Sequence, residues 1–232
     1  MAQAKLNRDG IRYLLTPFIW AIIMAAAFLL AAGRLNIFRG WLAFGVHFLG
    51  AIGGMLIMWR FAPGLANQRA AAREGTKKWD KAILLIYFLL ILIAIPIAAG
   101  LDVGRYGWSQ LTGSYAIVGI ILYVAYFFLF YWSILVNRHF EGTSRIQHDR
   151  GHQVISQGPY SFVRHPGYVA MIFASLSDPF IIGSLYSFIP SLAAIIAAVI
   201  RTFLEDKMLQ KELEGYSEYA QNTRYRLVPG LW

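Results

Sequence analysis

The amino-acid sequence of 232 residues contains no cysteine, which excludes disulfide bonds, thiolate metal sites and cysteine nucleophiles. Charged residues are scarce too: they make up 14% of the chain, against about 25% in a typical soluble domain. Hydrophobic residues make up 58%. This composition excludes an intrinsically disordered chain. It also argues against a water-soluble globular enzyme, because a chain of this size cannot bury so much apolar surface.

Acidic residues are the scarcer of the two charge types. The chain has 12 Asp and Glu against 21 Lys and Arg, a formal net charge of +9. In so apolar a chain this surplus indicates the inner face of a membrane, where anionic lipids and the bias of cytoplasmic loops favour Lys and Arg. Nucleic-acid binding is the weaker interpretation, because the basic residues are scattered between apolar blocks, and we expect no nucleic-acid partner.

Uncharged apolar blocks dominate the chain. They lie at residues 16–32, 41–59, 82–100, 114–136, 166–177 and 179–200. Each of the first four approaches the roughly 20 residues that a helix needs to cross a bilayer. Helix is the expected structure because lipid cannot satisfy an open backbone. The fifth block is too short to span upright, so the last two, separated by Asp178-Pro179, are compatible with a hairpin that penetrates only partly.

These blocks predict an all-α, polytopic transmembrane helical bundle with five to six membrane segments. We expect one integral membrane domain over residues 1–232, with four transmembrane helices in 1–136. Residues 137–232 are expected to hold a catalytic linker, the last membrane segments and a cytoplasmic tail. An amphipathic helix is expected in that tail, lying on the protein or on the membrane. Its apolar face would carry Leu204, Met208, Leu213, Tyr216 and Ala220.

Loop charges predict the orientation. Arg34, Arg39 and Arg105 fall on one side of the membrane, while the other 18 Lys and Arg lie on the side that carries both termini. The positive-inside bias therefore predicts that both termini are cytoplasmic. The longest polar stretches, 137–165 and 201–232, fall on the same side, where chemistry on a water-soluble reagent is expected.

Residues 151–168 carry the most informative pattern. Gly158-Pro159 marks a turn. Pro166 suits the first turn of the helix that follows, where its missing N–H costs nothing. Arg164 and His165 are thereby placed at a helix N-terminus at the membrane edge, where backbone donors and the positive end of the helix dipole favour an anionic group.

A second polar pattern begins at Arg201 and ends in the acidic pair Glu205-Asp206, at the cytoplasmic end of the last apolar block. Arg201 and Glu205 are four residues apart and share one helix face. Glu205 and Asp206 are separated by about 100° around the helix, so they cannot both point the same way.

Together the two patterns resemble a known family. The first pattern reads Gly158-x-Tyr160-x-x-x-Arg164-His165-Pro166-x-Tyr168, and the acidic pair follows it. This combination is similar to the membrane methyltransferases related to isoprenylcysteine carboxyl methyltransferase and the phospholipid N-methyltransferases. The tail resembles the C-terminal end of that family through Gly215-Tyr216-x-x-Tyr219 and Val228-Pro229-Gly230. The third span is preceded by Lys77-Lys78-Trp79-Asp80, as in many bacterial members. The specific matches cover residues 137–232. One position departs: the family usually has Glu-Glu where this chain has Glu205-Asp206.

The resemblance implies S-adenosylmethionine as methyl donor, in a cytoplasm-facing pocket formed by the linker, the final helices and the tail. No metal is implied. The acceptor would be lipophilic: a prenylated cysteine carboxylate, a phospholipid amine and another hydrophobic molecule all stay open. The cofactor-binding residues carried over are Gly158, Tyr160, Arg164, His165, Pro166, Tyr168, Glu205 and Asp206. The catalytic residues carried over are Arg164, Arg201 and Glu205.

Individual roles follow as hypotheses from the resemblance. Arg164 would pair with the methionyl carboxylate of the donor or with an acidic acceptor, so Arg164→Ala is expected to abolish methylation in a protein that still folds. His165 and Tyr160 would contact the donor. Glu205 would accept hydrogen bonds from donor hydroxyls or amine, or orient Arg201. Tyr168 would line the route to the acceptor.

Other polar or small residues have structural interpretations that we favour. His139, His148 and His152 are better explained as part of a polar linker than as a metal site. His47, inside the second span, is more often structural than functional. Gly50-x-x-x-Gly54 indicates close helix packing, with a dimer face as an alternative. Asp178 is expected to cap a hairpin turn.

Two other functions compete with the methyltransferase. A membrane reductase of the sterol-reductase kind has a similar C-terminal region and uses NADPH. A non-enzymatic membrane scaffold would bind neither cofactor and would tolerate substitution of Arg164 and Glu205.

Overall fold

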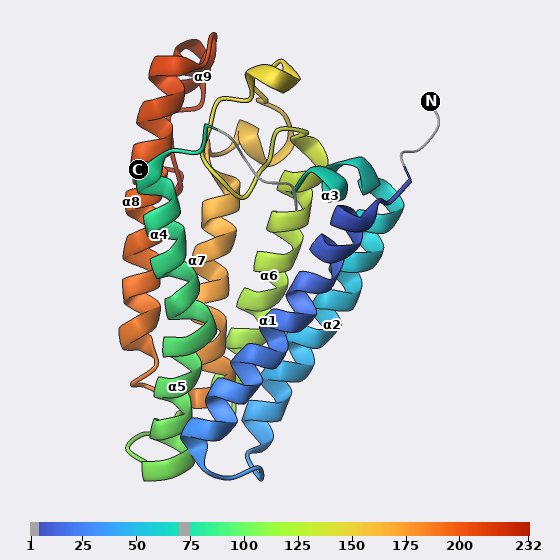
Figure 1. The fold of residues 1–232 in the computed structure, drawn as a ribbon. Coiled ribbons are helices and arrows are strands. Elements are labelled where there is room, and N and C mark those ends of the chain that lie inside the picture. The colour runs from blue at the N-terminus through green and yellow to red at the C-terminus, as the bar shows by residue number, and fades with distance from the viewer. Residues whose placement is uncertain (1–4, 70–74) are drawn as a thin grey trace.

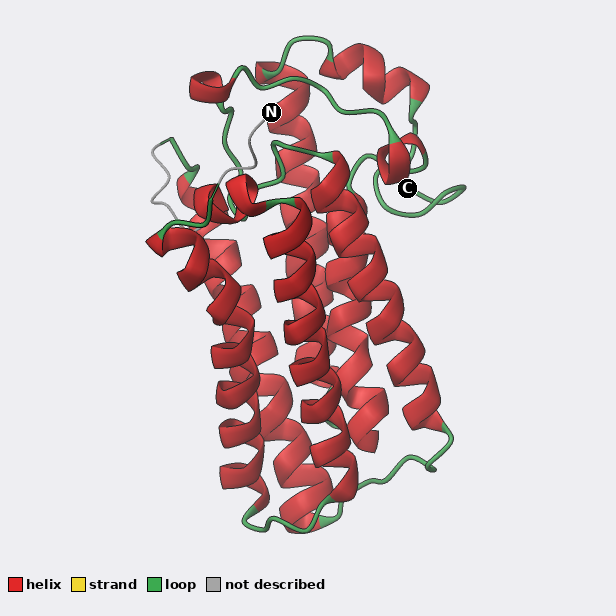
Figure 2. Cartoon of the chain, turned by 90° about the vertical axis from the view of Figure 1, so that its right-hand side faces the viewer, coloured by secondary structure: helices red, strands yellow, loops and turns green. Residues whose placement is uncertain are grey.

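The computed structural model describes residues 5–69 and 75–232, and that part of the chain folds into helices without any strand (Figures 1 and 2). Arg73, one of the cations counted on the cytoplasmic side, lies outside the described residues. Six of the described helices are long and apolar enough to cross a membrane: Arg8–Ala32, Phe38–Phe61, Lys78–Tyr106, Tyr115–Val136, Pro166–Gly183 and Phe188–Glu212. The all-α polytopic bundle is confirmed, and the last two apolar blocks are separate helices of 18 and 25 residues.

Short elements complete the order along the chain. The first two spans are α1 (Arg8–Ala32) and α2 (Phe38–Phe61), followed by the short α3 (Pro63–Arg69). The third span joins α4 (Lys78–Leu89) and α5 (Ile95–Ala99) with the π-helical segments Leu90–Ala94 and Gly100–Tyr106. Then come α6 (Tyr115–Val136), α7 (Pro166–Asp178) with its π-helical extension Pro179–Gly183, α8 (Phe188–Glu212) and α9 (Tyr216–Asn222).

Prolines accompany two of these π-helical segments. Pro96 lies in α5 directly after the first segment, and Pro179 begins the extension of α7. A proline inside a helix lacks the N–H for the regular hydrogen bond, and its ring clashes with the carbonyl four residues earlier. A π-helical turn relieves both problems without ending the helix. The spans therefore keep their length across these prolines.

The outer surface of the bundle is apolar. Leu30, Phe128 and Ile189 are exposed by 77%, 63% and 68%. Large exposed side chains of this kind recur along the long helices, which is far more apolar surface than a soluble monomer exposes. The surface thus matches a bundle surrounded by lipid.

Buried polar clusters tie the helix ends together at the end of the bundle opposite the termini. The fully buried Asp102 accepts hydrogen bonds from the side chains of Ser109 and Ser184 at 2.5 and 2.6 Å. Arg39 donates to the backbone carbonyls of Phe180 and Ile181 at 2.6 and 2.7 Å. These bonds satisfy backbone groups that the helix ends leave open.

Gly50 and Gly54 make room for aromatic side chains of the same chain. A Cβ atom on Gly50 would lie 2.0 Å from the hydroxyl oxygen of Tyr123, and one on Gly54 would lie 1.8 Å from that of Tyr131. Both tyrosines belong to α6. The glycine pair therefore serves packing of α2 against α6 within the chain, as its spacing predicts.

Asp178 does not cap a turn, contrary to the expectation from sequence. Its Oδ1 lies 2.8 Å from Nε2 of His47, so the pair connects α7 to α2 inside the bundle. The π-helical extension explains the difference, because the chain stays helical through Pro179 instead of turning at Asp178.

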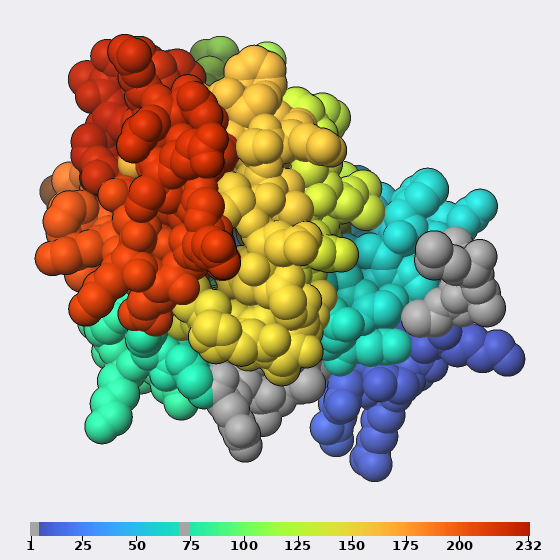
Figure 3. Space-filling model, turned by 90° about the horizontal axis from the view of Figure 1, so that it is seen from above, coloured from blue at the N-terminus to red at the C-terminus, as the bar shows by residue number. Residues whose placement is uncertain are grey.

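The end that carries both termini is covered by the linker and the tail (Figure 3). The predicted apolar face of the tail is divided between two helices, because α8 ends at Glu212 and α9 begins after Gly215, which has φ = 78°. A left-handed conformation of this kind favours glycine. Leu213, Tyr216 and Tyr219 are buried against Tyr160, so the tail packs on the protein.

A close contact between a glycine of α6 and the backbone of α7 and its extension gives a test of this packing. A Cβ atom on Gly119 of α6 would lie 2.6 Å from the backbone nitrogen of Ile181 and from the backbone oxygen of Ser177. Because backbone cannot rotate away, we expect Gly119→Ala to lower the free energy of unfolding by about 1–3 kcal/mol. Thermal unfolding in detergent measures this. Gly113→Ala is the control, since no atom lies within 4 Å of its Cβ position; equal stability of the two variants would contradict the packing.

Candidate active site

The motif around Arg164 begins α7 at the end of the bundle that carries the termini. Pro166 stands in the first turn of α7, as predicted. The backbone N–H groups of Arg164 and His165 donate to the carbonyls of Tyr225 and Arg226 at 2.9 and 3.0 Å. The C-terminal tail therefore runs alongside the motif.

Asp206 is the centre of a buried ionic network. Its side chain is fully buried, and Arg164 contacts it through two bonds, Nε to Oδ1 at 2.7 Å and Nη2 to Oδ2 at 3.0 Å. Arg226 donates to Oδ2 at 2.8 Å, and Nε2 of His165 lies 3.1 Å from Oδ1. Further donors are Gln210 and Tyr216. The network joins α7, α8 and the tail at one carboxylate.

Protein acceptors surround the guanidinium of Arg164. Besides Asp206, it donates from Nη1 to the backbone carbonyls of Thr223 and Arg224 at 2.9 and 2.7 Å. Burial by itself lowers the pKa of Arg164, but the hydrogen bonds and the charge of Asp206 outweigh it and raise the pKa above its ordinary value. This geometry makes Arg164 the cation that holds the tail against α7 and α8.

Glu205 points away from Asp206, as their separation around the helix predicts. The hydroxyl of Tyr168 donates to Oε2 of Glu205 at 2.7 Å, and the hydroxyl of Ser144 in the linker donates to the same oxygen. The other oxygen, Oε1, has no hydrogen-bond partner among the described residues. Glu205 therefore keeps one acceptor free.

Arg201 pairs with Asp80 of α4. Its Nε donates to Oδ1 of Asp80 at 2.7 Å, and its Nη2 donates to the carbonyl of Gly142 at 2.9 Å. The guanidinium lies over the ring of Tyr168, 5.2 Å from the ring centre. Asp80, which is fully buried, also accepts from the backbone and side chain of Ser144. Arg201 is thus oriented by Asp80, a residue that the sequence placed in a motif but gave no role.

The linker between α6 and α7 is held by its own ion pairs. Glu141, whose side chain is 1% exposed, binds Arg145 at 3.0 Å and Arg150 at 3.2 Å. The rings of His139 and His152 lie side by side, with centroids 4.8 Å apart. Burial and the neighbouring His139 lower the pKa of His152 to about 4. The linker is therefore a folded cover rather than an open loop.

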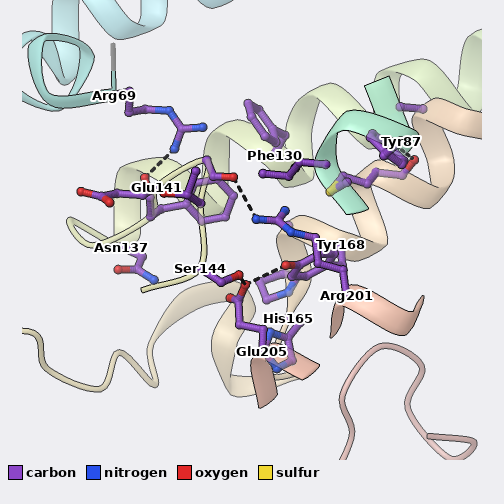
Figure 4. A pocket seen from close by; sticks show the side chains of 18 of the residues that line it. Arg69, Tyr87, Phe130, Asn137, Glu141, Ser144, His165, Tyr168, Arg201 and Glu205 are labelled. Atoms are coloured by element: carbon purple, nitrogen blue, oxygen red, sulfur yellow. Dashed lines mark hydrogen bonds between the residues drawn. The ribbon is translucent and has the colours of Figure 1, made fainter. Parts of the chain in front are cut away.

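A cavity of about 330 Å³ lies beneath this cover (Figure 4). Its polar end is lined by motif residues, and its interior by aromatic residues of the spans such as Trp20 and Phe127. The predicted site residues that line it are Tyr160, Arg164, His165, Pro166, Tyr168, Arg201 and Glu205. Gly158 and Asp206 do not line it: Gly158 packs near Trp132 and Val136, and Asp206 lies in the ionic network.

The sequence assigned no ligand-binding role to four polar residues of the cavity. Ser144, Glu141, His139 and Arg69 all line it. Arg69 is the last residue of α3 and lies outside every motif that the sequence showed. Their common signal is polarity next to a membrane segment, which is too general to select them.

Two buried nitrogen atoms at the cavity, Nε of Arg69 and Nδ1 of His139, have no hydrogen-bond partner among the described residues. Nε2 of His139 accepts from Arg138 at 3.1 Å, which leaves the ring proton on Nδ1. Burial and the charge of Arg138 lower the pKa of His139, which favours the neutral ring. Since an unsatisfied buried donor costs about 1–3 kcal/mol, both atoms indicate a place for a ligand acceptor.

The three linker histidines do not converge. His148 is exposed, away from the adjacent rings of His139 and His152. In the described part of the chain no group of three or more His, Asp or Glu side chains is arranged to hold a metal ion.

The buried pair changes the expectation for Arg164→Ala. Removal of Arg164 leaves the carboxylate of Asp206 buried with less compensation, and breaking such a pair costs about 3–5 kcal/mol. We therefore expect a large loss of stability, measured by unfolding in detergent, rather than an inactive but fully stable protein. Lys207→Ala, at an exposed neighbouring position, is the control; an unfolding midpoint equal to wild type in Arg164→Ala would contradict the structural role.

The depressed pKa of His152 predicts a pH dependence of stability. The unfolded chain binds a proton on His152 near its ordinary pKa of 6.5, while the folded chain binds it only near pH 4. The free energy of unfolding should therefore fall as the pH drops from 6.5 to 4, because the unfolded state binds more protons. His152→Gln should reduce this fall in denaturation curves, whereas the exposed His148→Gln should not. Identical pH profiles for wild type and His152→Gln would refute the assignment.

Comparison with known proteins agrees with the geometry. Among curated proteins no sequence matches the chain. Residues 117–211, which include α7, the Arg164 motif and the acidic pair, match the model of the isoprenylcysteine carboxyl methyltransferase (ICMT) family. The resemblance inferred from the motif is thereby confirmed, and the family implies a membrane methyltransferase. Over residues 117–211, the chain is similar to the isoprenylcysteine carboxyl methyltransferase family.

Proposed function

We propose that the chain transfers a methyl group from S-adenosylmethionine to a lipophilic acceptor at the cytoplasmic face of the membrane. One observation carries the proposal: a single cavity is lined by the polar residues Glu205 and His165 and by Trp20 and Phe127 of the membrane-spanning helices. A polar donor and a lipid-soluble acceptor can meet in such a cavity at reacting distance.

The cytoplasmic placement rests on charge. Both termini, the linker and the tail lie at one end of the bundle (Figure 1). The three cations at the opposite end, Arg34, Arg39 and Arg105, donate to backbone carbonyls there. The positive-inside bias favours the cytoplasm for the end that carries the termini.

The polar end of the cavity fits the donor. S-adenosylmethionine supplies an activated methyl group on its sulfonium when bound. Oε1 of Glu205 is an open acceptor for ribose hydroxyl or amine groups. Nδ1–H of His139 and Nε–H of Arg69 are open donors for its carboxylate or ring nitrogens. The chain therefore offers acceptors and donors of the kinds that this molecule requires.

Arg164 and Asp206 act as positioning residues in this proposal. Their ion pair holds the tail and the start of α7, and with them His165 and Tyr168, at the cavity. Arg201 and Asp80 hold the ring of Tyr168 and the linker from the other side. The methyl transfer itself needs little more than this alignment and the exclusion of water.

The acceptor decides whether a base is required. A carboxylate, such as that of an isoprenylcysteine, is already a nucleophile and needs none. A protonated amine would have to lose a proton first, and Glu205 and His165 are the candidates. The family match favours a carboxylate over an amine at the reacting end of the acceptor.

Label transfer tests the function. Purified protein in lipid nanodiscs is incubated with methyl-labelled S-adenosylmethionine and a membrane lipid extract, and the labelled product is identified. We expect a labelled lipid and binding of the donor, with no binding of NADPH. Binding of NADPH alone would replace the proposal with the reductase, and binding of neither with the scaffold.

Glu205→Gln tests the donor site. The substitution keeps the size of the side chain and removes the charge that strengthens its hydrogen bonds, so we expect donor binding to weaken about tenfold to a hundredfold. Calorimetric titration with S-adenosylmethionine measures this. Glu214→Gln, at an exposed position in the same tail, is the control. Unchanged affinity in Glu205→Gln would remove Glu205 from the donor site.

A further inference from the structure

An ionisable pair lies deep in the membrane-spanning part of the bundle. Nε2 of His47 in α2 and Oδ1 of Asp178 in α7 are 2.8 Å apart, and their side chains are 18% and 7% exposed. His47 is the tenth of the 24 residues of its span. Ionisable side chains at such depth are costly and mark functional sites by default. Within residues 5–69 and 75–232, no hydrogen bond joins this pair to the linker, the tail or the Arg164 motif.

The pair borders the same cavity as the candidate active site, at its other end. His165, Tyr168, Met171 and Asp178 line the cavity from one face of α7. The 13 residues of α7, Pro166–Asp178, correspond to about 20 Å along a helix. The cavity therefore runs from the polar end down into the bilayer and ends at a second polar group.

Polar atoms of this pair are open to the cavity. The hydrogen bond uses Nε2 of His47 and Oδ1 of Asp178, while Nδ1 and Oδ2 have no hydrogen-bond partner among the described residues. Neither atom is among the enclosed unsatisfied atoms of that part of the chain. A purely structural pair would be expected to have both ends satisfied or sealed by apolar side chains. These two atoms instead offer hydrogen bonds to a ligand.

Tyr123 adds a third polar group. Its ring stands edge-on to the ring of His47, with centroids 4.9 Å apart, and it lines the same cavity. Its hydroxyl occupies the space that a side chain at position 50 would fill. No partner among the described residues binds this hydroxyl. Acceptor and donor atoms thus converge at the deep end of a cavity with otherwise apolar walls.

We propose that His47, Asp178 and Tyr123 form a subsite for an uncharged hydroxyl or carbonyl group carried at the far end of a lipophilic molecule. The hydrogen bonds available there suit such a group, whereas a second charge in the bilayer would be costly next to a pair that already compensates itself. The inference rests on the proposed function in that this molecule is the methyl acceptor. A hydrocarbon tail alone leaves the subsite unsatisfied.

Binding of two matched probes tests the subsite. Farnesol and a farnesene hydrocarbon of the same chain length differ in the hydroxyl group, and their binding to the full-length protein in nanodiscs is measured by quenching of tryptophan fluorescence, corrected for empty nanodiscs. One hydrogen bond in an apolar cavity corresponds to roughly a tenfold preference for the alcohol. We expect Tyr123→Phe and Asp178→Asn each to remove most of that preference and to leave the hydrocarbon affinity unchanged.

A second tyrosine of α6, Tyr115, provides the control for Tyr123. Tyr115→Phe removes a hydroxyl from the same helix at a position that is 43% exposed and outside the cavity, and should keep the preference. Tyr123→Phe leaves the His47–Asp178 pair intact, so it tests the subsite even where Asp178→Asn does not fold. Equal binding of the two probes to wild type, no binding of either, or equal losses for both in the variants would overturn the subsite.

Donor binding on the same samples separates the two proposals. If the wild-type protein shows no preference for the alcohol but still binds S-adenosylmethionine and transfers the label, only the subsite is overturned. Absence of donor binding with the alcohol preference intact overturns the proposed methyl transfer and leaves a lipid-binding cavity with a polar end.

Discussion

The buried carboxylate of Asp206 is the interaction on which the rest of the site depends. Arg164 comes from the start of α7, Arg226 from the tail and Gln210 from α8, and all three donate to it. A carboxylate with no exposure is tolerable only with such a full set of donors. The hydrogen bonds that satisfy this carboxylate also hold the tail over the end of the bundle. The tail thereby covers the cavity.

A second pair, Arg201 with Asp80, performs the equivalent task on the other side of the cavity. It fixes α4 against α8 and, through Ser144, the folded linker. Between the two pairs stands Glu205, the carboxylate with an oxygen left open. The fully paired charges hold the helices, linker and tail that enclose the cavity. The polar atoms that lack a partner face the space where a ligand fits.

The cavity combines two environments that rarely share one space. Its upper part carries charged and polar side chains of the linker and motif, while its lower part passes between aromatic side chains of the spans. The deep end of the cavity is polar again because it is bordered by the His47–Asp178 pair. A hydrocarbon tail bound there would need no polar side chains. An acceptor is thereby expected to match three zones in order: polar, apolar and polar.

Much of this protein can be derived from its sequence. Uncharged blocks of near-membrane length predict the helical bundle because lipid leaves the backbone no other solution. The Arg164 motif with its acidic pair indicates the resemblance to a family of membrane methyltransferases, which the family model also matches over residues 117–211. The helical period alone also separates Glu205 from Asp206. Only the tertiary structure decided which charges compensate one another: Arg164 with Asp206, Arg201 with Asp80, and His47 with Asp178. These partners lie 42, 121 and 131 residues apart, and no local periodicity relates them. A buried charge takes whichever partner the packing of distant helices brings within reach, and that choice exists only once the bundle is assembled.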